Sequence, residues 1–209
     1  MHNQTFGFLV FPGLEELDLI GPWEMITMWH EIAQGPRAVS IAESSGLISC
    51  RKGLHIMPDY TISDCPSLDF LLVPGGMGTR TERYNEKLIN FISDQSQHCQ
   101  AVLSVCTGAL LLYQAGLLMN RSACTHHRMF AEMSGYEGVE MVAQRYIQDG
   151  PIWTSAGVSA GTDMALAFIA HVAGPEVAGR IQLETEYYPD DVLYPLPDGA
   201  LLPSVYDKT

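Results

Sequence analysis

Cys106 stands where one apolar segment ends and another begins, within the sequence AVLSVCTGALLL of residues 101–112. The residues before the cysteine have the length and composition of a buried strand, and those after Gly108 predict a helix. A sulfur at such a corner lies over the first turn of the helix, where free N–H groups and the helix dipole favour a thiolate. A thiolate is a strong nucleophile, so the segment favours a reactive cysteine over a buried structural one.

A candidate proton carrier, Asp18, lies in the largely apolar sequence LDLIGP of residues 17–22. Burial among apolar groups disfavours the charged carboxylate and raises its pKa, which suits a general acid or base. A helix cap or a solvated acid is the alternative. Glu15, Glu16 and Glu24 compete for the same role, and the sequence leaves that choice open.

Further residues are of types that assist such chemistry. Gly75 and Gly76 let backbone N–H groups approach a substrate closely, as an oxyanion cradle for developing negative charge, or they form a simple tight turn. Thr107 can donate a hydrogen bond into the pocket or cap its own helix. His126 can polarise or orient Cys106, or it is a structural histidine.

The elements that must position these residues follow from apolar periodicity. Strands are predicted over residues 5–11, 38–43, 69–73, 101–106, 139–148 and 151–155, with a small hairpin over 47–58. Helices are predicted over residues 21–30, 85–98, 107–118, 126–134, 159–172 and 176–188, with Pro22 at a first helical position. Apolar strands that alternate with helices indicate a mainly parallel sheet covered on both faces.

Three segments with candidate residues come directly after predicted strands, at residues 12–22, 74–78 and 106–108. In a doubly wound sheet, ligands bind beyond the carboxyl ends of the parallel strands. We therefore expect a carboxylate, a glycine-rich loop and the cysteine to meet at one edge of the sheet.

The composition limits what kind of protein this is. The chain has 209 residues, of which 47% are hydrophobic, and it predicts a single domain over residues 1–209. Its core spans about residues 5–188, and a proline-containing tail over 189–209 is expected to be irregular. The formal charge is −13, from 11 basic and 24 acidic residues, with no basic cluster. Nucleic acid and anionic membranes are therefore not expected as partners.

The location and the absence of metal are also expectations from sequence. No apolar run approaches the roughly 18–20 residues that span a bilayer, and the N-terminus lacks signal-peptide features, so we expect a cytoplasmic protein. The five cysteines are odd in number and contain no C-x-x-C pair, which predicts neither a disulfide framework nor a zinc site. The histidines are scattered, and we expect no metal and no cofactor.

Together these motifs resemble the ThiJ/PfpI superfamily. They are FP at 11–12 with LDL-x-GP at 17–22, VPGG-x-G at 73–78, VCTG at 105–108, TH at 125–126 and SAG-x-D at 159–163. The resemblance covers about residues 5–188. It implies a class I glutamine amidotransferase-like, flavodoxin-like three-layer α/β sandwich with the cysteine on a strand-to-helix nucleophile elbow. Within the superfamily, the sequence around Asp18 and the Cys-Thr-Gly elbow look most like those of isonitrile hydratases.

That resemblance implies roles for three residues. Cys106 is the nucleophile that attacks the terminal carbon of R–N≡C, Asp18 is the general acid and base, and Thr107 is a supporting hydroxyl. Water then releases an N-substituted formamide from a thioimidate. The implied substrate is a small neutral electrophile, so we expect no cationic clamp. Members of the superfamily are commonly homodimers, and Trp23, Trp29 and Phe130 are candidates for an interface or for the core.

Two positions depart from relatives in this superfamily. Peptidase-like members have a histidine directly after the cysteine, where this chain has Thr107, which argues against a Cys-His proteolytic arrangement. Hydratase-like relatives have an aromatic residue after the equivalent of His126, where this chain has His127, which places the pocket's shape in question.

Two alternatives to a hydratase stay open. One is a glyoxalase or deglycase that acts on reactive carbonyls through Cys106, His126 and a nearby acid. The other is a cysteine oxidation sensor or ligand-binding module, because the same motifs occur in domains fused to AraC-type DNA-binding domains. This chain carries no basic helix-turn-helix of its own.

Overall fold

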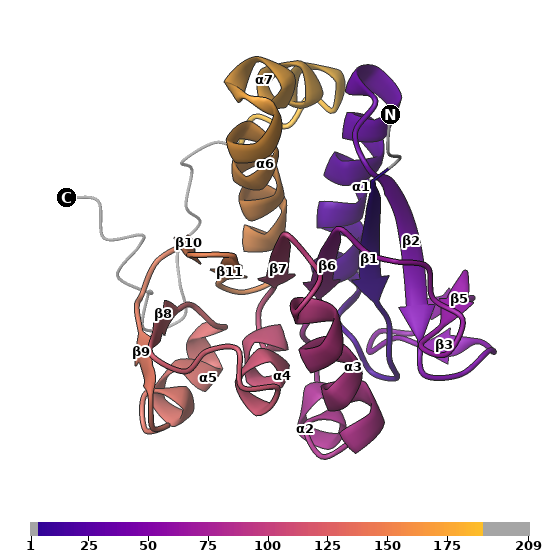
Figure 1. The fold of residues 1–209 in the computed structure, drawn as a ribbon. Helices are drawn as coiled ribbons and strands as arrows, with labels where there is room; N and C mark the ends of the chain where they lie inside the picture. Colours follow the sequence, from indigo (N-terminus) through magenta and orange to yellow (C-terminus); the bar gives the residue numbers. More distant parts are fainter. Residues whose placement is uncertain (1–3, 190–209) are drawn as a thin grey trace.

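The computed structural model describes residues 4–189, and a seven-stranded sheet lies at its centre (Figure 1). The strand order is β10-β11-β7-β6-β1-β2-β5, and every neighbouring pair is parallel except β10 with β11. The strands are β1 (Thr5–Leu9), β2 (Arg37–Ala42), β5 (Tyr60–Thr61), β6 (Phe70–Val73), β7 (Ala101–Ser104), β10 (Tyr146–Asp149) and β11 (Ile152–Ser155). Two small sheets pair β3 (Ile48–Ser49) with β4 (His55–Ile56), and β8 (Arg121–Ala123) with β9 (Val139–Met141).

Helices lie on both sides of the central sheet (Figure 1). They are α1 (Glu16–Ala33), α2 (Thr79–Glu82), α3 (Glu86–Ser96), α4 (Gly108–Gln114), α5 (His127–Met133), α6 (Ala160–Ala173) and α7 (Pro175–Glu184). Helices α1, α6 and α7 pack against one another on one side, and α3 and α4 pack together on the other. The predicted fold class, a mainly parallel α/β sandwich, is confirmed.

Helix α1 begins earlier than predicted. It starts at Glu16 rather than at Gly21, and it holds Pro22 in its interior. Because proline has no N–H, the helix forgoes the hydrogen bond that residue 22 would make to the carbonyl of Asp18. The earlier start places Asp18 in the first turn of a helix rather than in a loop.

Other differences concern short elements. The single strand predicted over residues 139–148 is two strands, β9 and β10, in different sheets. Strands β5 and β8 and helix α2 were not predicted, because segments of two to four residues carry no measurable periodicity. The hairpin predicted over residues 47–58 is confirmed as β3 and β4. All but the first residue of the tail predicted over 189–209 lie outside the described residues.

The core lies between the sheet and the helices on either side of it. Phe168 of α6 meets the ring of Phe70 at 5.2 Å and that of Phe6 at 6.0 Å between centroids. Trp29 is buried in this core, and the ring of Trp23 packs against Phe8. Its burial within this cluster makes Trp29 a core residue.

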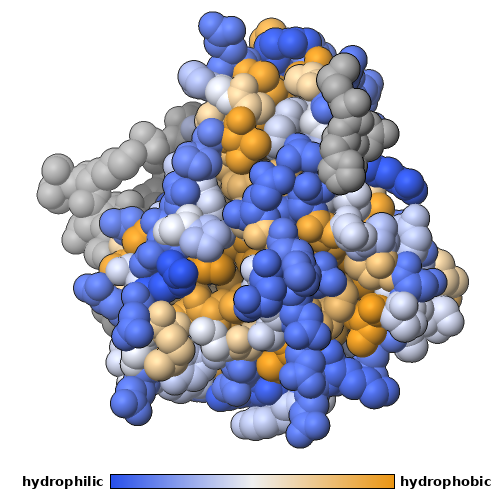
Figure 2. Space-filling view, viewed as in Figure 1, coloured by the Kyte–Doolittle hydropathy of each residue, from blue (hydrophilic) through white to orange (hydrophobic). Residues whose placement is uncertain are grey.

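The face in Figure 2 is largely hydrophilic, with apolar patches between hydrophilic residues. Among the described helices, none is long and apolar enough to cross a membrane. The three predicted strand ends meet through hydrogen bonds: Gly78 N–H donates to the carbonyl of Gly13 at 3.0 Å, Glu15 N–H donates to that of Gly75 at 2.9 Å, and Gly76 N–H donates to the hydroxyl oxygen of Thr107 at 2.9 Å. The loops after β1 and β6 are thereby held together at the carboxyl edge of the sheet.

Candidate active site

Cys106 lies on a sharp turn between β7 and α4. Its φ of 57° is in the left-handed region, which is unusual for a residue with a side chain. Its backbone N–H donates to the carbonyls of Ser155 and Ala156, and the hydroxyl of Thr125 donates to its carbonyl at 2.9 Å. These bonds hold the strained conformation and fix the direction of the side chain.

The Cys106 sulfur is buried and has polar neighbours. The backbone N–H groups of Thr107 and Val158 donate to it and act to lower its pKa. Burial and the nearby Asp18 carboxyl outweigh them and raise the pKa of the thiol to about 12. The thiolate expected from the helix N-terminus alone is therefore not the resting form. The expectation failed because neither the burial of the sulfur nor the adjacent acid is visible in the local sequence.

Asp18 is the acid beside the sulfur. It is 0% exposed, and its Oδ2 accepts the backbone N–H of Gly75 at 2.9 Å. Within residues 4–189, no protein N–H or O–H group donates a hydrogen bond to its Oδ1. Burial, and to a smaller extent the charge of Glu15, raise the pKa of Asp18 to about 7 against the opposing effect of the Gly75 bond. The carboxyl and the Cys106 thiol interact, so their protons titrate as a coupled pair.

The competing acids have other partners or face solvent, although Glu15 also lines the cavity over the sulfur. Glu15 is buried and forms ion pairs with Arg51, at 3.0 Å, and with Lys52. Glu16 accepts the backbone N–H of Lys52 at 2.6 Å, and Glu24 is exposed. The structure thus favours Asp18 over its three neighbours as the acid next to the cysteine.

The N–H groups of Gly75 and Gly76 donate hydrogen bonds to other groups of the protein. Gly75 N–H holds Asp18, and Gly76 N–H donates to the hydroxyl oxygen of Thr107 at 2.9 Å. The hydroxyl of Thr79 also donates to that oxygen, at 3.1 Å. These two glycines therefore position the acid and Thr107, which differs from the predicted oxyanion cradle. Thr107 makes no side-chain cap to its own helix.

Val158 was missed by sequence reasoning. Its φ of 40° is an outlier for a β-branched residue, and its N–H donates to the Cys106 sulfur. The preceding Gly157 has no room for a Cβ, which would lie 2.5 Å from the ring of His126. A glycine followed by a strained valine directs a backbone donor at the sulfur, and no local sequence pattern signals that geometry.

His126 lies in the same cavity as Cys106. Its Nδ1 accepts the backbone N–H of Arg128 at 3.2 Å. Burial, followed by the charges of His127, Arg128 and Arg80, lowers the pKa of His126 to about 4. The ring is therefore neutral near pH 7 and does not supply a positive charge to the thiol.

The cavity over the sulfur has a volume of about 230 Å³. Besides Cys106, Thr107 and His126, its lining includes Glu15, Gly76, Met77, Val158 and three arginines, Arg51, Arg80 and Arg128. The sequence predicted no cationic clamp, whereas the structure places three arginines in the lining of the cavity. These arginines are far apart in sequence, so no basic cluster was visible before folding.

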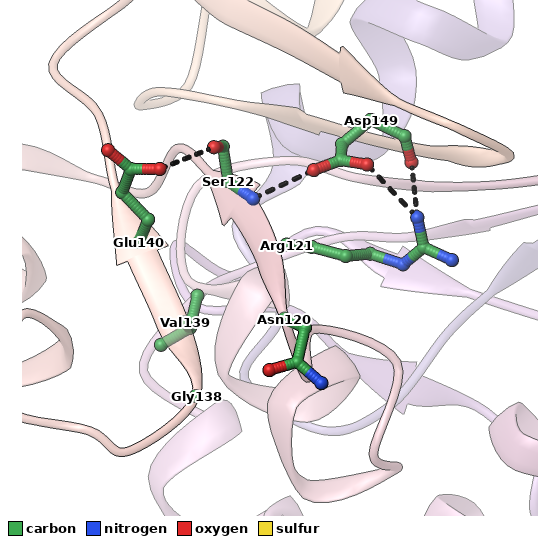
Figure 3. Close-up of a pocket in the computed structure, with 7 residues that line it drawn as sticks. All are labelled: Asn120, Arg121, Ser122, Gly138, Val139, Glu140 and Asp149. Atoms are coloured by element: carbon green, nitrogen blue, oxygen red, sulfur yellow. Dashed lines mark hydrogen bonds and ion pairs between the residues drawn. The ribbon is translucent and has the colours of Figure 1, made fainter.

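A larger cavity of about 350 Å³ lies between β8, β9 and the end of β10 (Figure 3). Its polar groups bond one another: Arg121 pairs with Asp149 at 3.0 Å, and Ser122 donates to Glu140 at 3.0 Å. None of the predicted site residues lines this cavity. Within the described part of the chain, no group of three or more His, Cys, Asp or Glu side chains could hold a metal ion.

Comparisons with known proteins identify the family of this chain. The profile of the DJ-1/PfpI family matches residues 5–171. The chain is 34% identical to the isonitrile hydratase of Pseudomonas putida, covering 88% of this chain and 78% of that protein. It is 28% identical to a deglycase of Pyrococcus horikoshii, covering 73% of this chain and 89% of that protein. A crystal structure of a ThiJ/PfpI family protein from Pseudomonas syringae superimposes with a TM-score of 0.85 at 31% identity, covering 96% of this chain and 80% of that one.

A further group of relatives is longer than this chain. An HTH-type transcriptional regulator of Pseudomonas aeruginosa is 27% identical over 190 residues, and the match covers 85% of this chain. The chain spans about half the length of that regulator, 49% of it.

Proposed function

The chain belongs to the DJ-1/PfpI family, and from that membership and the geometry around Cys106 we propose that it hydrates small isonitriles to N-substituted formamides. The observation that carries the proposal is the buried, interacting pair of the Asp18 carboxyl and the Cys106 thiol, of which Cys106 lines a small cavity. The similarity to an isonitrile hydratase over most of the chain supports the same reaction.

In the first step, sulfur adds to the isonitrile carbon. Near pH 7 the pair consists mainly of a Cys106 thiol and an Asp18 group that is partly ionised. The carboxylate accepts the thiol proton as a bond forms between sulfur and the terminal carbon of R–N≡C. The carbon then takes that proton from Asp18, which gives the thioimidate R–N=CH–S–Cys106 and returns the carboxylate.

In the second step, water replaces sulfur. Asp18 removes a proton from water as the oxygen adds to the thioimidate carbon, and it passes that proton to the nitrogen. The tetrahedral adduct R–NH–CH(OH)–S–Cys106 then loses its hydroxyl proton to Asp18 and expels the sulfur. The formamide R–NH–CHO leaves, the pair regains its proton, and the sum of both steps is the addition of one water.

The surroundings of the pair suit this cycle. A carboxyl with a pKa of about 7 accepts and donates protons with comparable ease at neutral pH. The N–H groups of Thr107 and Val158 stabilise negative charge on sulfur when it forms and when it leaves. Thr107 adds a hydroxyl that ties the elbow to Gly76.

Turnover of a simple alkyl isonitrile to its formamide, followed by NMR, tests the proposal. We expect turnover by the native chain and a loss of about a thousandfold or more in kcat for Cys106→Ala and for Asp18→Asn. Circular dichroism of each variant shows whether its fold is retained. Full activity in either folded variant would refute the role that we assign to that residue.

A deglycase-type reaction is a second candidate, supported by the similarity to the Pyrococcus horikoshii deglycase. The acid at the cysteine and the neutral His126 in the same cavity are compatible with attack on a carbonyl. Consumption of methylglyoxal with no turnover of isonitriles would favour this candidate.

An oxidation sensor has less support from the structure. Peroxide-sensitive cysteines combine a low pKa with solvent access, whereas the thiol of Cys106 is 5% exposed and burial raises its pKa. Mass spectrometry after mild peroxide treatment compares Cys106 with Cys50 and Cys65, and preferential oxidation of Cys106 would restore the sensor hypothesis.

Other features stay predictions. We propose that the chain forms a single domain over residues 1–209, acts as a homodimer and resides in the cytoplasm. Sedimentation velocity tests the dimer, because a monomer of 23.0 kDa is well separated from a species of twice that mass.

A further inference from the structure

Among residues 4–189, the cations without a carboxylate partner are Arg37, Arg80, Arg128 and Arg180, and two of these line the Cys106 cavity. Among residues 4–189, the cations that pair with a carboxylate are Arg51, Lys52, Arg83, Lys87, Arg121 and Arg145. Arg80 and Arg128 have no carboxylate partner within the same range, yet both line the cavity. In a chain with 24 acidic and 11 basic residues, two such guanidinium groups at one small cavity call for an explanation.

Arg80 is held at the cavity by neutral oxygens. Its Nη1 donates to the carbonyl of Gly76 at 2.9 Å and reaches the hydroxyl of Thr107 at 3.4 Å. These bonds orient the guanidinium group beside the elbow but leave its charge without a negative partner among the described residues. Its remaining N–H groups make no hydrogen bond within residues 4–189, so they can serve a ligand.

Arg128 approaches from α5, next to His126. Its backbone N–H donates to the His126 ring, and its guanidinium group makes no hydrogen bond or ion pair with the described residues. Both Arg80 and Arg128 act on that ring electrostatically and disfavour its protonation. Both arginines line the cavity that also holds this ring.

The carboxylates near these two arginines already have other partners: Glu132, whose carboxylate Arg80 stabilises electrostatically, pairs with Arg83 at 3.3 Å. Glu15, the carboxylate in the cavity lining, is bound by Arg51 and Lys52. Asp18 interacts with Cys106 and Gly75 at the reacting end. Guanidinium groups match carboxylates through parallel N–H donors, and partial burial strengthens such pairs.

We propose that Arg80 and Arg128 bind a carboxylate on the substrate, so that the preferred substrates are small isonitriles that carry a carboxylate a short distance from the isocyano group. The identity of the reacting group rests on the proposed function, whereas the anion site does not. The arginines hold the anionic end while the isonitrile carbon meets the Cys106 sulfur. They also attract an anion toward a protein whose net charge of −13 would otherwise repel it.

The first experiment compares two substrates of nearly equal size, isocyanoacetate and its neutral amide, isocyanoacetamide. We expect kcat/KM to favour isocyanoacetate by about 10- to 100-fold, as for hydrogen bonds to a charged group. Arg128→Gln should remove most of that preference, through a lower kcat/KM for isocyanoacetate. Arg37→Gln is the matched control, since Arg37 is exposed, lies at the start of β2, and loses the same charge. Equal turnover of both substrates by the native chain overturns the proposed substrate class.

The second experiment does not depend on hydratase activity. Cys106 is alkylated with iodoacetate and with iodoacetamide, and peptide mass spectrometry gives the ratio of the two rates at this residue. We expect the ratio of the iodoacetate rate to the iodoacetamide rate to be higher at Cys106 than for free 2-mercaptoethanol. This ratio should decrease at least several-fold in Arg128→Gln but not in Arg37→Gln. A ratio that Arg128→Gln leaves unchanged overturns the anion site. An Arg128-dependent ratio in a protein that turns over neither isonitrile retains the anion site and rejects the hydratase.

Discussion

At the scale of single residues, the site depends on how one carboxyl and one thiol affect each other. Asp18 and Cys106 are both buried, and burial raises the pKa of each. The Asp18 carboxyl therefore titrates near neutrality while the thiol stays protonated. In such a pair the thiol transfers its proton to the acid during the attack on the substrate. It is not present as a free thiolate beforehand.

The pH dependence of the rate should report Asp18. The proposed cycle needs its carboxylate, so kcat/KM for an alkyl isonitrile should fall about tenfold per pH unit below about 7. Initial rates across pH, corrected for spontaneous acid hydrolysis, measure this acid limb of the pH–rate profile. Glu24→Gln, which removes an exposed acid from the same helix, should retain it. A limb centred near pH 4 would indicate His126 in place of Asp18.

The raised pKa of Asp18 also predicts how the free energy of unfolding changes with pH. The folded protein binds the Asp18 proton more tightly than the unfolded chain, so ionisation destabilises the fold as pH rises from about 4 to about 7. Asp18→Asn can still accept the Gly75 N–H and carries no charge. We expect it to be more stable than the native chain at pH 8, by at most about 4 kcal/mol, and about equal near pH 4.

Urea unfolding of both proteins at these two pH values measures the difference. The charges that act on Asp18, chiefly Glu15 and then Lys52, are common to both proteins and largely cancel. Equal stability at both pH values would show that the Asp18 carboxylate is better solvated than its burial implies.

At the scale of elements, three loops depend on close backbone approach. The loop after β6 places Gly75 between the first turn of α1 and the elbow after β7. A Cβ at Gly75 would lie 2.5 Å from the N atom of Thr107 and 2.8 Å from Asp18 Oδ2. The absence of a side chain there lets one backbone segment hold both halves of the site.

Two glycine-to-alanine variants distinguish an effect on the active site from an effect on the stability of the fold. Gly75→Ala should displace Asp18, lower kcat by at least about tenfold and destabilise the fold by roughly 1–3 kcal/mol. Gly179→Ala, in the middle of α7 with open space around its Cβ, should stabilise the fold by about 0.5–1 kcal/mol and leave kcat unchanged. Thermal unfolding and turnover of both variants give the comparison, and a fully active Gly75→Ala would contradict the tight contact.

At the scale of the whole molecule, the charge of −13 opposes the compact state. The ion pairs are mostly on the surface, where each contributes roughly 0–1 kcal/mol. Mutual repulsion among the excess acids should therefore dominate the response to salt.

Raising NaCl from about 10 mM to about 0.1 M shortens the screening length from roughly 30 Å to roughly 10 Å. We expect Tm to rise by a few degrees at pH 8, as measured by differential scanning calorimetry. A fall in Tm would mean that screening weakens attractive pairs, such as Arg145 with Asp163, more than it relieves repulsion.

The amino-acid sequence by itself determined the fold class, the turn at Cys106 and the choice of Asp18 as a candidate. Each is encoded locally, in apolar periodicity, in a glycine after a cysteine, or in one acid among apolar neighbours. The start of α1 was misplaced because Pro22 is a weaker signal than the tertiary contacts that extend the helix across it.

Only the tertiary structure decided what surrounds the sulfur. Arg51, Arg80 and Arg128 reach the cavity from three separate parts of the chain, and a strained Val158 turns its N–H toward Cys106. The pKa of the thiol likewise follows from burial and a neighbouring carboxyl. Such properties arise from distances between residues far apart in sequence, and local patterns carry no record of those distances.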